Sequence, residues 1–117
     1  MSGNFEYREY RPGDEEGIVD LLQKSFTKWR RRSVDYWKWK YVESPYGKHI
    51  CAAVDVDRII GVICDVPVHL KLGNQVIVAH YSDDTATDPD YRGMGVYSNL
   101  YKYYKDLANS ELPHLLL

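Results

Sequence analysis

The sequence predicts an α/β (α+β) fold with the element order β-α-α-β-β-β-α-β. Two observations carry this prediction. Two long stretches place apolar residues at the spacing of an amphipathic helix, and the stretches around them alternate or cluster apolar residues as strands do. The chain has 117 residues, 44% of them hydrophobic and 27% charged, which is typical of one ordinary globular domain. We therefore expect residues 1–117 to form a single domain.

The first predicted strand and helix come from the opening part of the chain. Residues 5–11 alternate apolar and polar side chains until Pro12 and Gly13 end the strand. Asp14 is a residue type favoured at helix N-caps, and the helix that it begins is expected to run for about four turns. The apolar face of this helix consists of Ile18, Leu21, Leu22, Phe26 and Trp29.

A second, short helix is expected between Ser33, which can cap its start, and Pro45, which would end it. Trp37 and Tyr41 would share one of its faces. The period then changes to that of strands, which are expected over residues 48–56, 58–72 and 75–88. Turns at Asp55 to Arg58 and at Gly73-Asn74 would join them. Pro67 indicates an edge, a bulge or a bend within the second of these strands.

The last predicted helix comes after a glycine-containing loop over residues 91–95 and runs to about Ala108. Residues 112–117 are then expected to start another buried strand. Because no later segment is there to cover this apolar strand, we expect the domain to be incomplete at its C-terminus or completed by another chain. A homodimer or a strand-swapped oligomer is therefore expected. The apolar face of the last helix consists of Val96, Leu100, Tyr104 and Leu107.

Charge, hydropathy and cysteine content exclude several function classes. The chain carries 15 Lys and Arg against 17 Asp and Glu, a near-neutral balance that does not indicate a dedicated nucleic-acid binder. No apolar run approaches the roughly 18 residues of a membrane-spanning helix, so we expect no membrane partner. The N-terminus is polar and acidic, without an export signal, so Cys51 and Cys64 are expected to be reduced thiols in the cytoplasm.

The segment most indicative of function is the loop at residues 91–95 with the helix that it opens. Gly93 and Gly95 allow the backbone to approach a ligand closely. The free N–H groups of the first helical turn and the helix dipole then make an anion site suited to phosphate. Arg92 adds a positive charge at the mouth of this site.

Two common phosphate-binding motifs do not fit this segment. The dinucleotide fingerprint needs three glycines spaced G-x-G-x-x-G within a strand-helix-strand unit, and only the first pair is present. The Walker loop needs a Gly-Lys pair followed by Ser or Thr, which is absent. The phosphate would therefore belong to another kind of ligand.

Residues 88–97, which read Asp-Pro-Asp-Tyr-Arg-Gly-Met-Gly-Val-Tyr, resemble the acyl-coenzyme A motif of the GNAT superfamily of N-acetyltransferases. The opening stretch, residues 7–26, resembles the usual start of that family. The resemblance extends over essentially the whole chain, which would form roughly the N-terminal two-thirds of the family's domain and end after its fifth strand. One departure is Tyr97, which stands where the family usually has Gly or Ala. Its side chain must turn away from the pyrophosphate or stack beside it.

The resemblance implies a mixed, mostly antiparallel sheet flanked by helices and acetyl-CoA as the co-substrate. It also implies a direct transfer of the acetyl or acyl group to a primary amine of an unknown acceptor. A main-chain N–H near Ala86 could stabilise the oxyanion of the thioester. By resemblance, the backbone of Thr85, Ala86 and Thr87 would pair with the pantetheine arm, and the backbone N–H groups of Arg92, Gly93, Met94, Gly95, Val96 and Tyr97 would hold the pyrophosphate.

Catalytic residues are expected on the strand that precedes this loop, where family members often place a general base. Asp84 is the first candidate, because a carboxylate facing the cleft could accept a proton from an ammonium directly or through water. Asp83 is its rival, with Tyr81 or His80 as further alternatives. Both acids could instead belong to a bulge or turn. The acid that protonates the thiolate sits on a later helix in the family and cannot be assigned here.

Other functions remain open. The chain could be a non-catalytic GNAT-like module that binds coenzyme A or a partner chain without turnover. Residues 28–40 interleave basic side chains with Trp29, Trp37 and Trp39. We expect a solvated or packing face there, and the segment could also suit an acidic or phosphorylated acceptor or, less well, a nucleic acid. The four histidines lack the spacing of metal ligands, so no metal site is expected. The two cysteines are expected to fill the core.

Overall fold

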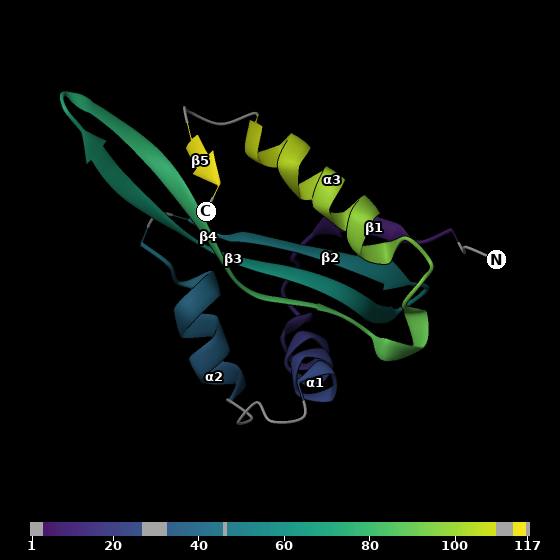
Figure 1. Cartoon of the computed structure of the whole chain (residues 1–117). Coiled ribbons are helices and arrows are strands. Elements are labelled where there is room, and N and C mark those ends of the chain that lie inside the picture. The colour runs from purple at the N-terminus through teal and green to yellow at the C-terminus, as the bar shows by residue number, and fades with distance from the viewer. Residues whose placement is uncertain (1–3, 27–32, 46, 110–113, 117) are drawn as a thin grey trace.

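The computed structural model describes residues 4–26, 33–45, 47–109 and 114–116, and it places helices on both faces of one curled sheet (Figure 1). The sequence prediction of the fold class and of the element order is confirmed. The elements are β1 (Glu6–Glu9), α1 (Glu15–Ser25), α2 (Val34–Trp37), the π-helical turn η1 (Lys38–Val42), β2 (His49–Asp55), β3 (Arg58–Leu72), β4 (Gln75–Thr87), the 3-10 turn η2 (Pro89–Tyr91), α3 (Val96–Asn109) and β5 (His114–Leu116).

The strands lie in the order β1-β2-β3-β4-β5, so each strand pairs with its neighbour in sequence. The first four are antiparallel. Tight turns return the chain directly from β2 to β3 and, at Gly73, from β3 to β4, while α1 and α2 lie between β1 and β2. β5 pairs with β4 in parallel, which requires a crossover, and α3 supplies it. The mixed, mostly antiparallel sheet implied by the sequence is therefore confirmed.

The two faces of the sheet carry separate cores (Figure 1). α1 and α2 cover one face, which we call the α1/α2 face, and the apolar stripe predicted for α1 is buried there through Ile18, Leu21 and Leu22. α3 covers the other, the α3 face, where Val96 and Leu100 are buried as the helical period predicts. Alternation along the central strands supplies both cores at once, as in a strand buried on two sides.

A bulge interrupts β4 and changes which residues face which core. Cys64 pairs with Asp84 while Asp65 pairs with Ser82, so Asp83 is an extra residue in β4. An extra residue shifts the alternation by one, so two even-numbered residues can face opposite sides. Asp84 faces the α1/α2 side, where Tyr41 contacts it, while His80 faces the α3 side, where its ring lies against Tyr104. Of the two acids expected to form either a bulge or a catalytic position, Asp83 forms the bulge through its backbone.

Two local expectations differ from the structure. α1 ends at Ser25, about one turn earlier than predicted, and Trp29 lies outside the described residues. Asp14 stands at the N-cap, yet its side chain binds the Arg8 guanidinium at 2.7 and 3.0 Å instead of capping the helix, because an ion pair outcompetes a single amide. Pro67, by contrast, is placed as expected: the pairing with β2 ends at His49–Asp65, so β3 is an edge strand on that side at Pro67, two residues past the bulge in the ladder. The strand expected over residues 112–117 is described at 114–116.

Candidate functional site

The loop between β4 and α3 is held in place by a buried acid, Asp88. Its carboxylate accepts hydrogen bonds from Lys24 at 3.1 Å, from Arg58 at 2.8 Å and from the Asp90 amide at 2.9 Å. Its own N–H donates to the Ile60 carbonyl at 2.7 Å. One side chain thereby ties the loop to α1 and to β3. Burial alone would raise the pKa of Asp88, but these donors outweigh it and the pKa lies below its usual value.

Tyr91 fixes the next turn of the loop. Its hydroxyl donates to Asp55 at 2.7 Å, and its ring packs edge-on against Phe5 with centroids 5.7 Å apart. The Arg58 guanidinium lies over the same ring at 5.5 Å. Tyr91 is therefore held by contacts from Phe5, just before β1, and from β2 and β3, and it fixes the chain just before the loop glycines and α3.

Gly93 and Gly95 adopt positive φ angles of 81° and 75°, a region that side-chain-bearing residues rarely occupy. The first α3 amide to bond within this turn is that of Asn99, which donates to the Gly95 carbonyl at 3.1 Å. The amides of Val96, Tyr97 and Ser98 belong to the opening turn, where a helix offers no acceptor of its own. The turn is close to the sheet, since a Cβ on Gly61 would lie 2.9 Å from the Val96 side chain.

A pocket of about 430 Å³ lies where this loop meets the end of β4. It collects most of the residues that the sequence assigned to coenzyme A. Met94 is the exception, because its side chain packs toward the α3 core. The ring of Tyr97 turns toward Tyr101, with centroids 6.0 Å apart, and is half exposed. The pocket is lined by Ser25, Phe26, Thr85, Ala86, Thr87, Tyr91, Arg92, Gly93, Gly95, Val96, Tyr97 and Ser98.

Four of the lining residues were not among those predicted to bind coenzyme A: Ser25, Phe26, Tyr91 and Ser98. Ser25 and Phe26 come from the end of α1, and the sequence pattern placed Phe26 on the buried face of that helix. Phe26 is 41% exposed, because α1 ends just before it. An apolar residue just beyond the last turn of a helix is the signal that could have found it.

The pocket suits an extended, anionic ligand. One wall is the backbone of Thr85 to Thr87, at the C-terminal end of β4. In the described residues, β5 pairs with β4 at Val78 to His80, several residues before this wall. Another wall carries the opening turn of a 14-residue helix and the exposed Arg92 side chain. Amide donors, helix dipole and guanidinium all favour phosphate oxygens at that end. The residues present therefore fit the pyrophosphate and arm of coenzyme A.

Asp84 lies on the α1/α2 face of β4, two residues before Ala86, and is half-buried. The Tyr41 hydroxyl donates to its Oδ2 atom. Tyr41 is itself 1% exposed and packs against Trp37, with ring centroids 5.8 Å apart, so its hydroxyl is rigidly placed. The side chain of Asp83 lies outside the described side chains. Of the two acids proposed as bases, the structure thus gives Asp84 a defined partner.

Other predicted residues fall in places that bear on function. Cys51 and Cys64 are both buried, as expected, and they face opposite cores. Burial raises the pKa of the Cys51 thiol to about 12, so it is not a nucleophile at neutral pH. Trp37 is a core residue, while Trp39 is 65% exposed. The basic residues 28–32 lie outside the described residues.

Within the described residues, none of the helices has the length and apolar character needed to cross a membrane. Comparison with curated protein sequences gave no significant match. Many solved structures share the fold. They include a transcriptional regulator from Bacillus halodurans C-125, with a TM-score of 0.74 and 20% identity over 97% of this chain and 81% of that one.

Two Arabidopsis thaliana acetyltransferases also share the fold. Naa50, solved with the bisubstrate analogue CoA-Ac-MVNAL, has a TM-score of 0.74 and 18% identity over 97% of this chain and 70% of that one. Glucosamine-6-phosphate N-acetyltransferase has a TM-score of 0.71 and 19% identity over 98% of this chain and 82% of that one. The family model described as "Acetyltransferase (GNAT) domain" matches residues 6–111. With the sheet, the loop and this match in agreement, the chain belongs to the GNAT acetyltransferase family.

Proposed function

We propose that this chain binds acetyl-CoA in the pocket between β4 and α3 and transfers its acetyl group to a primary amine. The observation that carries the proposal is the convergence of Thr85–Thr87, Arg92 and the α3 N-terminus on one pocket. Asp84 precedes this stretch directly on β4. Membership of the GNAT family supports acyl transfer in general. The amine acceptor and the roles of individual residues are part of the proposal.

The binding half of the reaction rests on backbone groups. The amides from Arg92 to Tyr97 hold the pyrophosphate, and the Arg92 guanidinium offsets its charge. The backbone of Thr85 to Thr87 pairs with the amides of the pantetheine arm, as an added strand would. The arm leads the thioester toward Ala86, whose N–H donates to the oxygen as negative charge develops there. Acetyl-CoA supplies the acyl group as a thioester.

The catalytic half rests on Asp84. An amine in water is mostly an ammonium and cannot attack until it loses a proton. The Asp84 carboxylate, oriented by Tyr41, accepts that proton directly or through one water. The carboxylate is half-buried beside the end of β4 that leads into the pocket, so both substrates meet in one cleft. Asp83 remains the rival base.

The experiment that tests the proposal is calorimetric titration of the chain with acetyl-CoA, followed by an activity screen over small polyamines, amino sugars and lysine peptides. Saturable binding together with acetylation of at least one class supports the proposal. Absence of binding at millimolar acetyl-CoA contradicts the site. Fragments of coenzyme A, namely pantetheine alone and 3′,5′-ADP alone, then separate the contributions of the two walls of the pocket.

The second candidate function is a module that binds coenzyme A without turnover. The same pocket supports it, since binding needs only the backbone amides and Arg92. Binding of acetyl-CoA with no product over the whole amine panel favours this function. A nucleic-acid role is less favoured, because Trp37, one of the aromatic residues interleaved with the basic stretch, is buried in the core. Binding of RNA that weakens steeply with added salt would support that role instead.

A further inference from the structure

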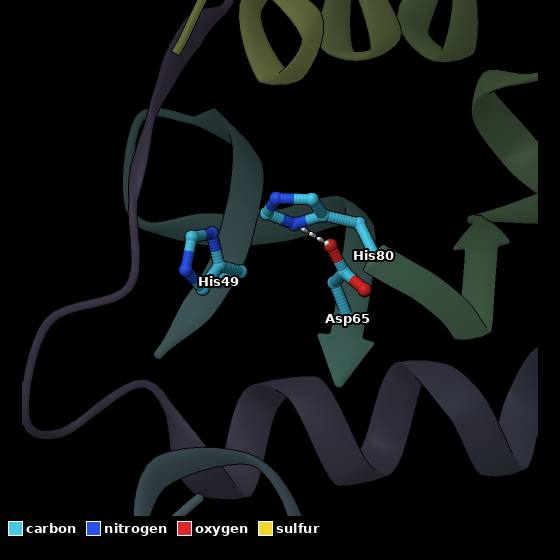
Figure 2. A group of neighbouring side chains, drawn as sticks. All are labelled: His49, Asp65 and His80. Atoms are coloured by element: carbon cyan, nitrogen blue, oxygen red, sulfur yellow. Dashed lines mark hydrogen bonds and ion pairs between the residues drawn. The ribbon is translucent and has the colours of Figure 1, made fainter. Parts of the chain in front are cut away.

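A cluster of metal-ligand side chains lies on the α3 face of the sheet, away from the proposed acetyl-CoA pocket. His49 is the first residue of β2 and pairs directly with Asp65 on β3, and His80 lies on β4, the next strand. Figure 2 shows the three side chains converging, with the contact between His80 and Asp65 dashed. Linear spacing concealed this set because each residue comes from a different strand.

The contacts among these side chains are short. His80 Nδ1 lies 2.9 Å from Asp65 Oδ2, and the rings of His49 and His80 meet edge to face with centroids 4.7 Å apart. The hydroxyl of Tyr104, from α3, also donates to Asp65 Oδ2. One atom from each of His49, Asp65 and His80 can be chosen so that all lie within 4.8 Å of one another.

The negative charge of the Asp65 carboxylate is only partly compensated by hydrogen-bond donors. Asp65 is 0% exposed and His80 1% exposed, so the carboxylate is removed from water. Both hydrogen bonds that it receives go to Oδ2, and no group in the described part of the chain donates to Oδ1. A buried carboxylate oxygen without a donor is costly, and a bound cation is one of the few ways to offset that cost.

The chemistry of the three side chains selects the kind of cation. Two imidazoles and one carboxylate form a ligand set used by Zn²⁺ and by other late divalent transition metals, with one position left for water. A tetrahedral zinc ion with bonds of about 2.0–2.2 Å holds its ligand atoms roughly 3.3 Å apart. The Asp65–His80 pair is already near that spacing. His49 is half-buried at the start of its strand, where it can close the remaining distance and admit an ion from solvent.

We propose that His49, Asp65 and His80 form a binding site for one divalent transition-metal ion, with zinc as the reference ion. The ion takes the place of the proton between His80 Nδ1 and Asp65 Oδ2, and that proton passes to Nε2 or to solvent. Tyr104 remains a hydrogen-bond donor to the bound carboxylate. The site joins β2, β3 and β4 beneath α3, on the face opposite Asp84, so metal binding stabilises the sheet without taking part in acyl transfer.

The test is calorimetric titration of the untagged full chain with Zn²⁺ at neutral pH, with Co²⁺ absorption as a second readout. The expected result is saturable binding of one ion per chain and the intense visible bands of tetrahedral Co²⁺. Removing one ligand by His49→Gln should weaken binding by at least about tenfold. Lowering the pH to about 5 should release the ion, because protonated imidazole cannot ligate.

His69→Gln is the matched control. His69 lies on β3, the strand that carries Asp65, but it is exposed and outside the cluster. The control variant should bind zinc like the parent. His49→Gln is the deciding variant because its half-buried side chain can change without emptying the core, unlike Asp65→Asn. Absence of saturable binding in the parent, or parental affinity in His49→Gln, would show a hydrogen-bonded Asp65–His80 pair only and overturn the proposal. Acetyl-CoA binding, measured on the same variants, should not change, which separates this test from that of the proposed function.

Discussion

The surroundings of Asp84, more than its residue type, make it the candidate base. The carboxylate faces the α1/α2 side because Asp84 pairs with Cys64, whose side chain lies in that core, and a buried tyrosine from η1 fixes its rotamer. Tyr41 does not face the pocket that we assign to acetyl-CoA, so we regard it as a positioning residue for Asp84.

The first prediction concerns this pair. Asp84→Asn should lower kcat by about 10²–10⁴-fold while leaving acetyl-CoA affinity nearly unchanged, since a general base acts on the amine and not on the thioester. The loss should shrink at high pH, where the amine is already neutral. Tyr41→Phe should lower kcat by a smaller factor, because the carboxylate stays and only its orientation loosens. Unchanged turnover in Asp84→Asn would move the base to Asp83 or to no side chain.

Arg92 gives the second prediction at this scale. Arg92→Glu places a negative charge beside the pyrophosphate and removes a positive one, so saturable binding of acetyl-CoA should be lost. Lys71→Glu makes the same change of charge on the exposed β3–β4 hairpin and should leave binding unaltered. Calorimetric titration of both variants checks this. Parental affinity in Arg92→Glu would mean that the loop does not hold the phosphates.

At the scale of elements, the start of α3 sets the shape of the site. The helix can begin where it does because Gly95 takes a positive φ and because Gly61 lets Val96 approach β3. The prediction is that Gly95→Val abolishes acetyl-CoA binding, because the side chain strains the turn and fills the space where the ligand's phosphates approach. Gly13→Val imposes a comparable backbone strain, at a φ of 108°, in the β1–α1 turn. It should cost stability and leave binding intact.

Asp88 makes the same loop sensitive to acid. Its pKa in the folded chain is lowered, so its charge contributes stability above the unfolded pKa of about 3.9, and that contribution is lost as the pH falls through the folded value. Asp88→Asn keeps an acceptor for the Asp90 amide but removes the charge facing Lys24 and Arg58. We expect it to lower the free energy of unfolding by about 1–2 kcal/mol at neutral pH, discounted because both cations are partly exposed.

Urea unfolding at pH 7 and at about pH 3 measures this effect. The difference between Asp88→Asn and the parent should narrow at the acid pH, where Asp88 is losing its charge in the parent as well. Asp57→Asn, an exposed acid in the β2–β3 turn, should match the parent at both values. A constant difference for Asp88→Asn across the range would show that shape, and not charge, accounts for the role of Asp88.

Elements with a strong period could be predicted from the sequence. The apolar stripe of α3, the Ser33 cap of α2, whose hydroxyl accepts from Tyr36 at 3.0 Å, and the Gly73 turn all follow from local rules. The loop at Gly93 and Gly95 was predictable because two closely spaced glycines before a helix are typical of a turn with positive φ angles. The bulge at Asp83 was not, because the polar run around it carries no alternation to reveal an extra residue. The metal-ligand cluster was also hidden, since it depends on register between strands.

At the scale of the whole molecule, the hairpin of β3 and β4 extends beyond the rest of the sheet (Figure 1). Near its tip Leu72 and Val76 are 59% and 58% exposed. A two-stranded ribbon with exposed apolar side chains is marginal on its own and favours pairing with another surface. This adds a second candidate contact to the C-terminal strand that the sequence indicated.

We therefore predict that the chain self-associates. Light scattering at tens of micromolar should give a mass above 13.7 kDa. The double variant Leu72→Lys, Val76→Lys should return a monomer if the hairpin forms the contact, and should leave the larger mass if the C-terminal strand does. A stable parental monomer would contradict the prediction.

The extra residue in β4, Asp83, makes the number of residues in this strand important for the site. The pairs on either side of it, Cys64 with Asp84 and Asp65 with Ser82, keep their faces whether or not Asp83 is present, since paired residues always face the same side. Deleting Asp83 would thus leave both cores with the same side chains and make the ladder continuous. A bulge bends and twists its strand, so the deletion would change the course of β4 just before Thr85 to Thr87. A change of length at this point should therefore weaken ligand binding in a chain that still folds.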